Sequence, residues 1–122
     1  MKKKLLVALF ALVSCVSMHA YKIRIDNDTD GTEATSVSVE FFSNNLLAQK
    51  PSIVKPDKEK SFKFKSRKFT ITAVRVTGID GLADRKAAFF EIPQGRLNKD
   101  IKIDVDVELD EGVVRLMLSQ DK

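Results

Sequence analysis

Apolar and polar residues alternate along most of this chain with a repeat of two. The longest such run is 101–109, which reads IKIDVDVEL, and shorter runs occupy 21–26, 37–41 and 62–65. Successive side chains of a β-strand point to opposite faces, so each run turns an apolar face toward a core and a polar face toward water. The pattern therefore predicts half-buried β-strands.

Turn sequences rich in Gly, Pro, Asp and Asn separate these runs, as tight turns require. They occupy 28–31, 78–81, 92–95 and 110–112. Further strands are expected near 68–77, 86–92 and 113–119. Half-buried strands at this regular spacing predict an all-β fold, an antiparallel, immunoglobulin-like β-sandwich of about seven strands.

Three segments do not fit the alternation. Residues 49–59, which include Pro51 and Pro56, are expected to form the longest loop and the best candidate for a mobile one. Residues 44–49 and 82–90 could each form a turn or two of helix, although neither shows a sustained helical repeat.

The first 20 residues have the three-part plan of an export signal: lysines at 2–4, an apolar run at 5–13, and small or polar residues up to Ala20. The apolar run is far shorter than the roughly 20 residues that span a bilayer. We therefore expect a signal peptide at 1–20 and a single exported domain at 21–122, in the periplasm or outside the cell.

Two processing routes are open. Cleavage after Ala20 would release a free domain. The sequence LVSC at 12–15 resembles the lipobox of bacterial lipoproteins, in which Cys15 would be lipidated and would anchor the chain to a membrane.

Removal of the signal changes the available chemistry. The whole chain has 21 basic and 17 acidic residues and a net charge of +4, whereas loss of the lysines at 2–4 leaves 18 basic residues and a net charge of +1. Cys15 and His19 are the only cysteine and histidine, and tryptophan is absent. Residues 21–122 therefore lack the groups for disulfides, for Cys or His zinc sites and for His-dependent nucleophilic catalysis. We therefore expect that the protein is not an enzyme and has no cofactor, with calcium as the one candidate ion.

The turn after the first strand resembles the beginning of a calcium loop. Asp26, Asp28 and Asp30 alternate ahead of Gly31, so three carboxylates could converge on one ion. The glutamate that completes such loops is missing, because Val37 occupies its position. The alternative is an ordinary polar turn.

A basic segment carries the candidate binding surface. Residues 50–75 contain nine basic and two acidic side chains, with phenylalanines between them. Strand alternation turns the rings inward and the charges outward, which argues against base stacking and specific nucleic-acid binding. A protein, a surface glycan or another polyanion is the expected partner of this surface, which comprises Lys60, Lys63, Lys65, Arg67 and Lys68.

Residues 100–121 carry the opposite charge, with seven acidic and two basic side chains. If this segment and the basic segment lie side by side, their charges could pair across a sheet. If they lie apart, the molecule would have a strong dipole and could self-associate or meet a charged partner. The sequence leaves both arrangements open.

These observations predict an exported bacterial β-sandwich that acts as a non-enzymatic binding module. The alternatives are a structural lipoprotein lipidated at Cys15, a calcium-stabilised adhesion module and, more distantly, a small hydrolase. Contact with a membrane is expected only for the lipidated form.

Overall fold

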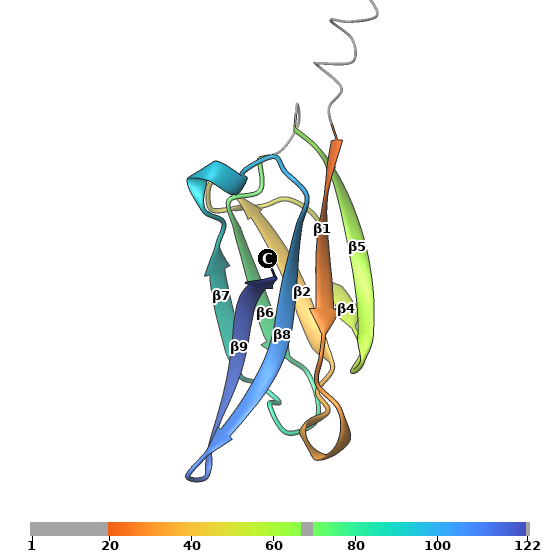
Figure 1. The fold of residues 1–122 in the computed structure, drawn as a ribbon, viewed down its shortest axis with the longest axis vertical. Coiled ribbons are helices and arrows are strands. Elements are labelled where there is room, and N and C mark those ends of the chain that lie inside the picture. The colour runs from red at the N-terminus through yellow and green to blue at the C-terminus, as the bar shows by residue number, and fades with distance from the viewer. Residues whose placement is uncertain (1–19, 67–69, 122) are drawn as a thin grey trace, which may run out of the picture.

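The computed structural model describes residues 20–66 and 70–121, which form two β-sheets packed face to face (Figure 1). The first sheet faces the viewer in Figure 1 and has the order β5 (Lys58–Lys65), β1 (Ala20–Asn27), β8 (Ile101–Asp110) and β9 (Val113–Asp121). The second sheet has the order β3 (Leu46–Leu47), β2 (Val37–Ser43), β6 (Ala73–Gly78) and β7 (Ala87–Glu91), and β4 (Ser52–Val54) also pairs with β2. The expected β-sandwich is confirmed. Residues 1–19 of the predicted signal peptide, with Cys15 among them, and Arg67 and Lys68 lie outside the described residues, whereas Ala20 begins β1.

The core lies between the sheets and is made by the apolar half of each alternating run. Ile23 and Ile25 of β1 and Ile103 of β8 are fully buried, as are the inward residues of β2 and β6. The Phe41 ring lies 4.7 Å from the Phe62 ring and 5.0 Å from the Phe64 ring, centroid to centroid. The other half of each run is consequently left on the outer faces.

One pairing departs from the antiparallel expectation. β1 and β8 run parallel, with Ile23 opposite Ile101 and Ile25 opposite Ile103, whereas the other paired strands of the described chain are antiparallel. This register keeps the apolar residues of both strands on the core side. The charged residues between them are therefore brought together on the outer face.

Two short strands occur where the sequence predicts other structure. β3 returns along β2 through Asn44 and Asn45, which have φ values of 51° and 70° and form a two-residue turn in place of a helical turn. β4 lies inside the predicted loop at 49–59 and pairs with β2. Residues 82–86 form turns, and β7 begins at Ala87.

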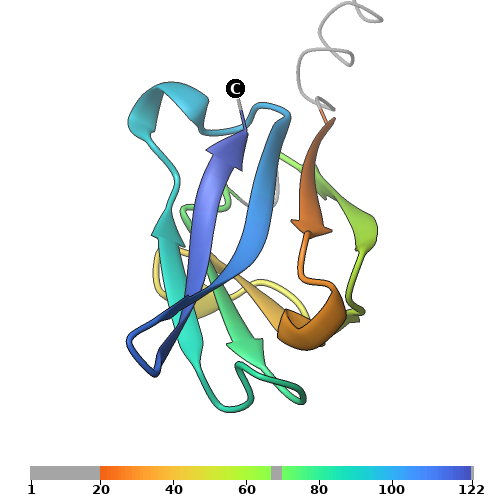
Figure 2. The ribbon, with the colours of Figure 1, turned by 60° about the horizontal axis from the view of Figure 1, so that its bottom comes forward.

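A buried polar network holds the segment after β1. The Asn27 side-chain amide donates to the carbonyl oxygens of Thr35 (2.7 Å) and Val54 (3.0 Å), and its Oδ1 accepts from Thr29 Oγ1 at 2.6 Å. Thr35 Oγ1 in turn accepts from the Ala83 amide at 3.1 Å. The network ties together segments at the end of the molecule that comes forward in Figure 2.

Candidate functional site

The outer face of the first sheet gathers charged residues in rows of one sign. Cross-strand neighbours in this sheet share a face, and Lys22 of β1 lies opposite Lys63 of β5. In the next row Arg24 lies opposite Lys102 of β8. Like charges that face each other across strands oppose folding. The face is therefore arranged at some cost in stability.

The following row reverses the sign. Asp26 of β1 lies between Glu59 of β5 and Asp104 of β8. On β1 and β5, cationic residues thus occupy the half of the face near the start of β1, and acidic residues occupy the half near its end. β9 adds charges of the opposite sign, with Asp121 opposite Lys102 and Arg115 opposite Glu108. β5 of the basic segment and β8 and β9 of the acidic segment lie on either side of β1 in the first sheet. The rest of the basic segment includes β4 and Arg75 of β6, which belong to the second sheet.

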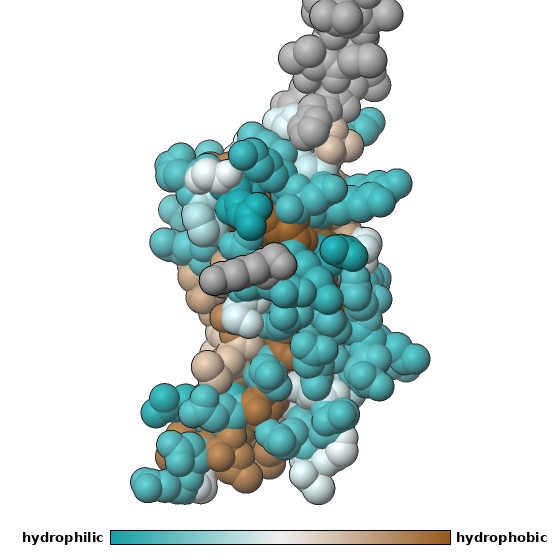
Figure 3. Space-filling model, in the orientation of Figure 1, coloured by the Kyte–Doolittle hydropathy of each residue, from teal (hydrophilic) through white to brown (hydrophobic). Residues whose placement is uncertain are grey.

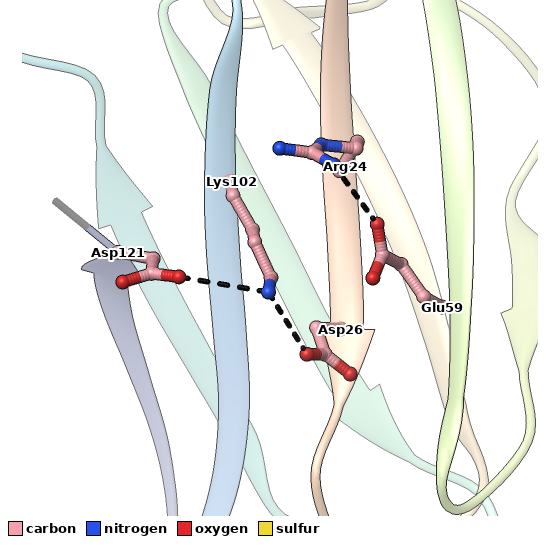
Figure 4. A network of polar contacts seen from close by, with 5 residues as sticks. All are labelled: Arg24, Asp26, Glu59, Lys102 and Asp121. Atoms are coloured by element: carbon pink, nitrogen blue, oxygen red, sulfur yellow. Dashed lines mark ion pairs between the residues drawn. The ribbon is translucent and has the colours of Figure 1, made fainter.

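Opposite charges meet where the two halves join (Figure 4). Arg24 Nη1 lies 3.5 Å from Glu59 Oε1, and Lys102 Nζ lies 3.4 Å from Asp26 Oδ2 and 3.5 Å from Asp121 Oδ2. The hydrogen bond to Asp26 raises the pKa of Lys102, so this ammonium stays charged. These pairs neutralise Arg24 and Lys102, whereas Lys22 and Lys63 have no ion pair with another described residue.

Three lysines form what we call the cationic corner: Lys22, Lys63 and Lys65. All three side chains are exposed, and none has an ion pair with another residue in 20–66 or 70–121. Lys60 belongs to the other side of β5, where its Nζ donates to Ser52 Oγ at 2.7 Å and lies 5.7 Å from the Phe62 ring centroid. Within the predicted basic surface, Lys63 and Lys65 therefore have no ion pair with a described residue, whereas Lys60 is hydrogen-bonded to Ser52.

A polar hollow of about 530 Å³ adjoins the cationic corner. It lies on the half of the outer face that is largely hydrophilic around a small apolar recess in Figure 3. Ile101 also lines it, although only 6% of this core residue is exposed. The charged side chains that line it are Lys22, Arg24, Arg96, Lys102, Glu59, Asp100 and Asp121.

Two polar contacts shape the hollow. The Lys22 backbone amide donates to Asp100 Oδ1 at 2.7 Å, which fixes that carboxylate beside β1. Arg96 follows Gly95 in the 3₁₀ helix η2 (Gln94–Arg96), and its Nε lies 3.0 Å from the Gln120 amide oxygen in the orientation of the amide that satisfies both groups. The alternation of β1 predicts that Lys22 and Arg24 share a face, but it does not predict the residues that η2 and β9 add.

The acidic half contains three carboxylates that could hold a hard cation. Carboxylate oxygens of Asp26, Asp28 and Asp104 lie within 4.8 Å of one another. Asp30, which the sequence pattern groups with Asp26 and Asp28, is not part of this cluster. The sequence pattern does not include Asp104, because this residue joins the cluster only through the parallel pairing of β1 with β8. Three such ligands fall short of the six to eight oxygens that calcium takes, so other ligands would have to complete the site.

The proximity of these carboxylates changes their titration. Desolvation and the negative charges of Asp26, Asp104 and Asp106 raise the pKa of Asp28, an exposed residue, to about 6. Burial also raises the pKa of Asp104, with a contribution from Asp121. The segment keeps its shape through the buried side chains of Asn27 and Thr29, which alternate with the aspartates. The turn is therefore held by protein hydrogen bonds whether or not an ion binds.

The outer face of the second sheet differs in character. Phe89 is 57% exposed and Leu47 is 48% exposed, and the Phe42 ring lies 6.4 Å from the Phe89 ring. The Arg75 guanidinium lies 5.4 Å from the Phe42 ring centroid and pairs with Glu40 at 2.7 Å. This face offers apolar contacts with one neutralised charge pair, whereas the first sheet offers unneutralised cations.

Across the described residues, none of the helices has the length and apolar character needed to cross a membrane. No known family model, curated protein sequence or solved structure matches this chain. The geometry of the molecule itself is consequently the basis for its functional interpretation.

Proposed function

We propose that this chain is an exported, non-enzymatic binding module whose cationic corner binds an anionic polymer such as a surface glycan. The observation that carries the proposal is the uncompensated lysine pair in which Lys22 of β1 lies opposite Lys63 of β5. Lys65 lies two residues further along the same face of β5.

The electrostatics explain why a polymer suits this surface. Each lysine gains little from a single dissolved counterion, but an array of anionic groups can neutralise several neighbouring lysines at once. Binding would relieve the repulsion between Lys22 and Lys63 that the free protein has to bear. A flat sheet face is also accessible to an extended polymer.

Binding to dextran sulfate, a sulfated polysaccharide, tests the proposal. The double variant Lys63→Glu, Lys65→Glu reverses two charges of the corner, and we expect it to bind at least tenfold more weakly than the wild type, because about 1.4 kcal/mol corresponds to a factor of ten. Lys86→Glu is the matched control, since Lys86 is exposed in the turn before β7, away from the first sheet. Equal weakening by a single reversal at Lys86 would mean that net charge alone governs binding.

If the double variant binds as the wild type does, the cationic corner is the wrong surface. The exposed apolar face around Phe42 and Phe89 would then be the better candidate, and its partner would be a protein. Circular dichroism and thermal unfolding of each variant check that the fold is retained.

A non-enzymatic role suits the positions of the carboxyl groups. Asp28 and Asp104 have a raised pKa, as a general acid would, but they do not line the hollow. The small hydrolase therefore remains the distant alternative. Hydrolysis of polysaccharide or peptide substrates that is lost on substitution of Asp100 or Asp121 would establish it over the binding module.

The export route decides between a free and an anchored module. Cleavage after Ala20 would yield a chain that begins at Tyr21, whereas lipidation would add a diacyl or triacyl group to Cys15. The intact mass of the protein from fractionated cells distinguishes the two. An anchored form would need detergent, rather than osmotic shock, for its release.

A calcium-stabilised adhesion module is the second candidate, favoured by the convergence of Asp26, Asp28 and Asp104. An ion that binds only the folded state would raise the melting temperature in calcium and lower it in chelator. Asp104→Asn should abolish the calcium response, whereas Asp30→Asn should retain it. A response lost in Asp30→Asn and kept in Asp104→Asn would favour the ligand set of the sequence pattern instead.

A further inference from the structure

The polar hollow on the first sheet has a composition that favours one class of ligand. Small-molecule pockets of about 300–1,000 Å³ are generally lined by apolar side chains, and this hollow, at about 530 Å³, is of that size but mostly polar. Its lining combines cations and carboxylates with two neutral polar residues, Ser61 and Gln120. A ligand that fits it must itself be polar and rich in hydrogen-bonding groups.

The cations of the hollow fall into two kinds. Arg24 and Lys102 are neutralised by carboxylates at the boundary between the two halves of the face. Lys22 and Arg96 have no ion pair within the part of the chain that the structure describes, and the Arg96 guanidinium contacts the neutral Gln120 amide. An anionic group of a ligand could therefore reach Lys22 or Arg96 without displacing an internal acid.

The carboxylates of the hollow supply the second part of the recognition. Asp100 is held by the Lys22 backbone amide through Oδ1, which leaves Oδ2 to accept a hydrogen bond. Asp121 and Glu59 likewise have acceptor capacity beyond their single ion pairs. Carboxylates accept hydrogen bonds from hydroxyl groups but repel anions, so they favour a ligand with one anionic group and several hydroxyls.

We propose that the hollow binds an anionic sugar, a hexose unit that carries a carboxylate or a phosphate. Its charged group meets Lys22 and Arg96, and its hydroxyls donate to Asp100 and neighbouring carboxylates. This inference deepens the proposed function, because Lys22 belongs to both the hollow and the cationic corner. The hollow would hold one unit while Lys63 and Lys65 attract the rest of a polymer.

The probes are glucose 6-phosphate and glucuronate, with glucose and inorganic phosphate as controls for the hydroxyls and the charge. In ¹H–¹⁵N spectra of the intact exported domain, we expect saturable shifts of the Lys22, Ile101 and Lys102 amides with the two acidic sugars. Glucose and inorganic phosphate should each bind at least tenfold more weakly. Equal affinity for inorganic phosphate and glucose 6-phosphate, or for glucose and glucuronate, would overturn the proposal.

Two variants locate the recognition. Arg96→Ala should weaken glucuronate binding about tenfold through the loss of a charge-assisted hydrogen bond, whereas Lys86→Ala, with the same charge change outside the hollow, should have no effect. Asp100→Asn preserves an oxygen that can accept from the Lys22 amide and should reduce the preference for glucose 6-phosphate over inorganic phosphate. If Arg96→Ala and Lys86→Ala bind alike, the hollow is not the site.

Different outcomes separate this inference from the proposed function. Binding of dextran sulfate that depends on Lys63 and Lys65, together with no binding of either acidic sugar, would retain the module and refute the sugar site. Binding of the sugars without any binding of dextran sulfate would do the reverse. Preference for a glucuronate oligomer over glucose 6-phosphate would identify a glycan as the source of the sugar, and the opposite preference would identify a soluble sugar phosphate.

Discussion

The two halves of one sheet face solve the same electrostatic problem differently. In the cationic corner Lys22 opposes Lys63, and in the acidic half Asp26 opposes Asp104, so both halves place like charges in register. The acidic half is relieved internally, because Lys102 bridges to Asp26 and the raised pKa of Asp28 eases proton uptake. Lys22 and Lys63 have no ion pair with another described residue that would relieve their repulsion. Two like charges opposite each other on neighbouring strands repel. Such a pair therefore points to an external ligand only where neither proton uptake nor an ion pair within the protein reduces the repulsion.

The largest expected effect concerns the support of the acidic half. Asn27→Ala removes a buried amide that donates to the carbonyl oxygens of Thr35 and Val54 and accepts from Thr29 Oγ1. We expect the free energy of unfolding to fall by about 2–4 kcal/mol, since several buried hydrogen bonds are lost at once. Chemical denaturation measures the change. Ser119→Ala, at an exposed position of β9, is the control and should change stability by less than about 0.5 kcal/mol.

The same substitution should disperse the carboxylates. Asn27 anchors the segment that places Asp28 beside Asp26 and Asp104, so we expect the pKa of Asp28 to move back toward its ordinary range. Carbon-13 NMR titration of the side-chain carboxyl groups follows this directly. An unchanged Asp28 titration in a folded Asn27→Ala protein would show that the network does not hold the cluster.

A smaller effect is expected for the pH dependence of the acidic half. The folded pKa of Asp28, about 6, lies above the value of about 3.9 expected in the unfolded chain, so the folded state binds this proton more tightly. Its contribution to stability is fully present below about pH 4 and is lost as the pH rises through 6. Because Asp28 is exposed to water, the contribution should not exceed about 1 kcal/mol.

Asp28→Asn isolates this contribution from the other titrating groups. We expect the variant to be more stable than the wild type at pH 7, with the advantage shrinking toward pH 5, as measured by thermal unfolding at each pH. The cationic corner offers a contrast, because Lys65→Gln should leave the pH dependence between 5 and 7 unchanged. A variant Asp28→Asn that is less stable than the wild type at pH 7 would contradict the assigned repulsion.

Much of the fold can be predicted from the sequence because it follows from local alternation. The run at 101–109 marks β8 unambiguously, and the phenylalanines at 62 and 64 are buried as their spacing requires. β4 escapes prediction because a strand of three residues is too short to show a period. β3 depends on Asn44 and Asn45 adopting positive φ, which the flanking sequence does not reveal as a hairpin.

The candidate site is only partly predictable because it depends on which strands become neighbours. Alternation places Lys63 and Lys65 on one outward face, but it cannot show that Lys22 will oppose Lys63. Asp26 and Asp28 are close in sequence, whereas Asp104 joins them through the long-range parallel pairing of β1 with β8. Arg96 enters the hollow from η2, a segment without any periodic signal. Each residue that the sequence pattern leaves out of the site thus reaches it through a tertiary contact between distant segments.

Thermal unfolding of Lys63→Glu, with and without dextran sulfate, tests the role of the cationic corner most directly. The new carboxylate faces Lys22, so the repulsive pair becomes attractive, and we expect the variant alone to gain about 0.2–1 kcal/mol, a melting temperature a few degrees higher. Dextran sulfate should raise the melting temperature of the wild type and raise that of the variant much less. A variant that is no more stable than the wild type and responds equally to the polymer would contradict a corner kept cationic for binding.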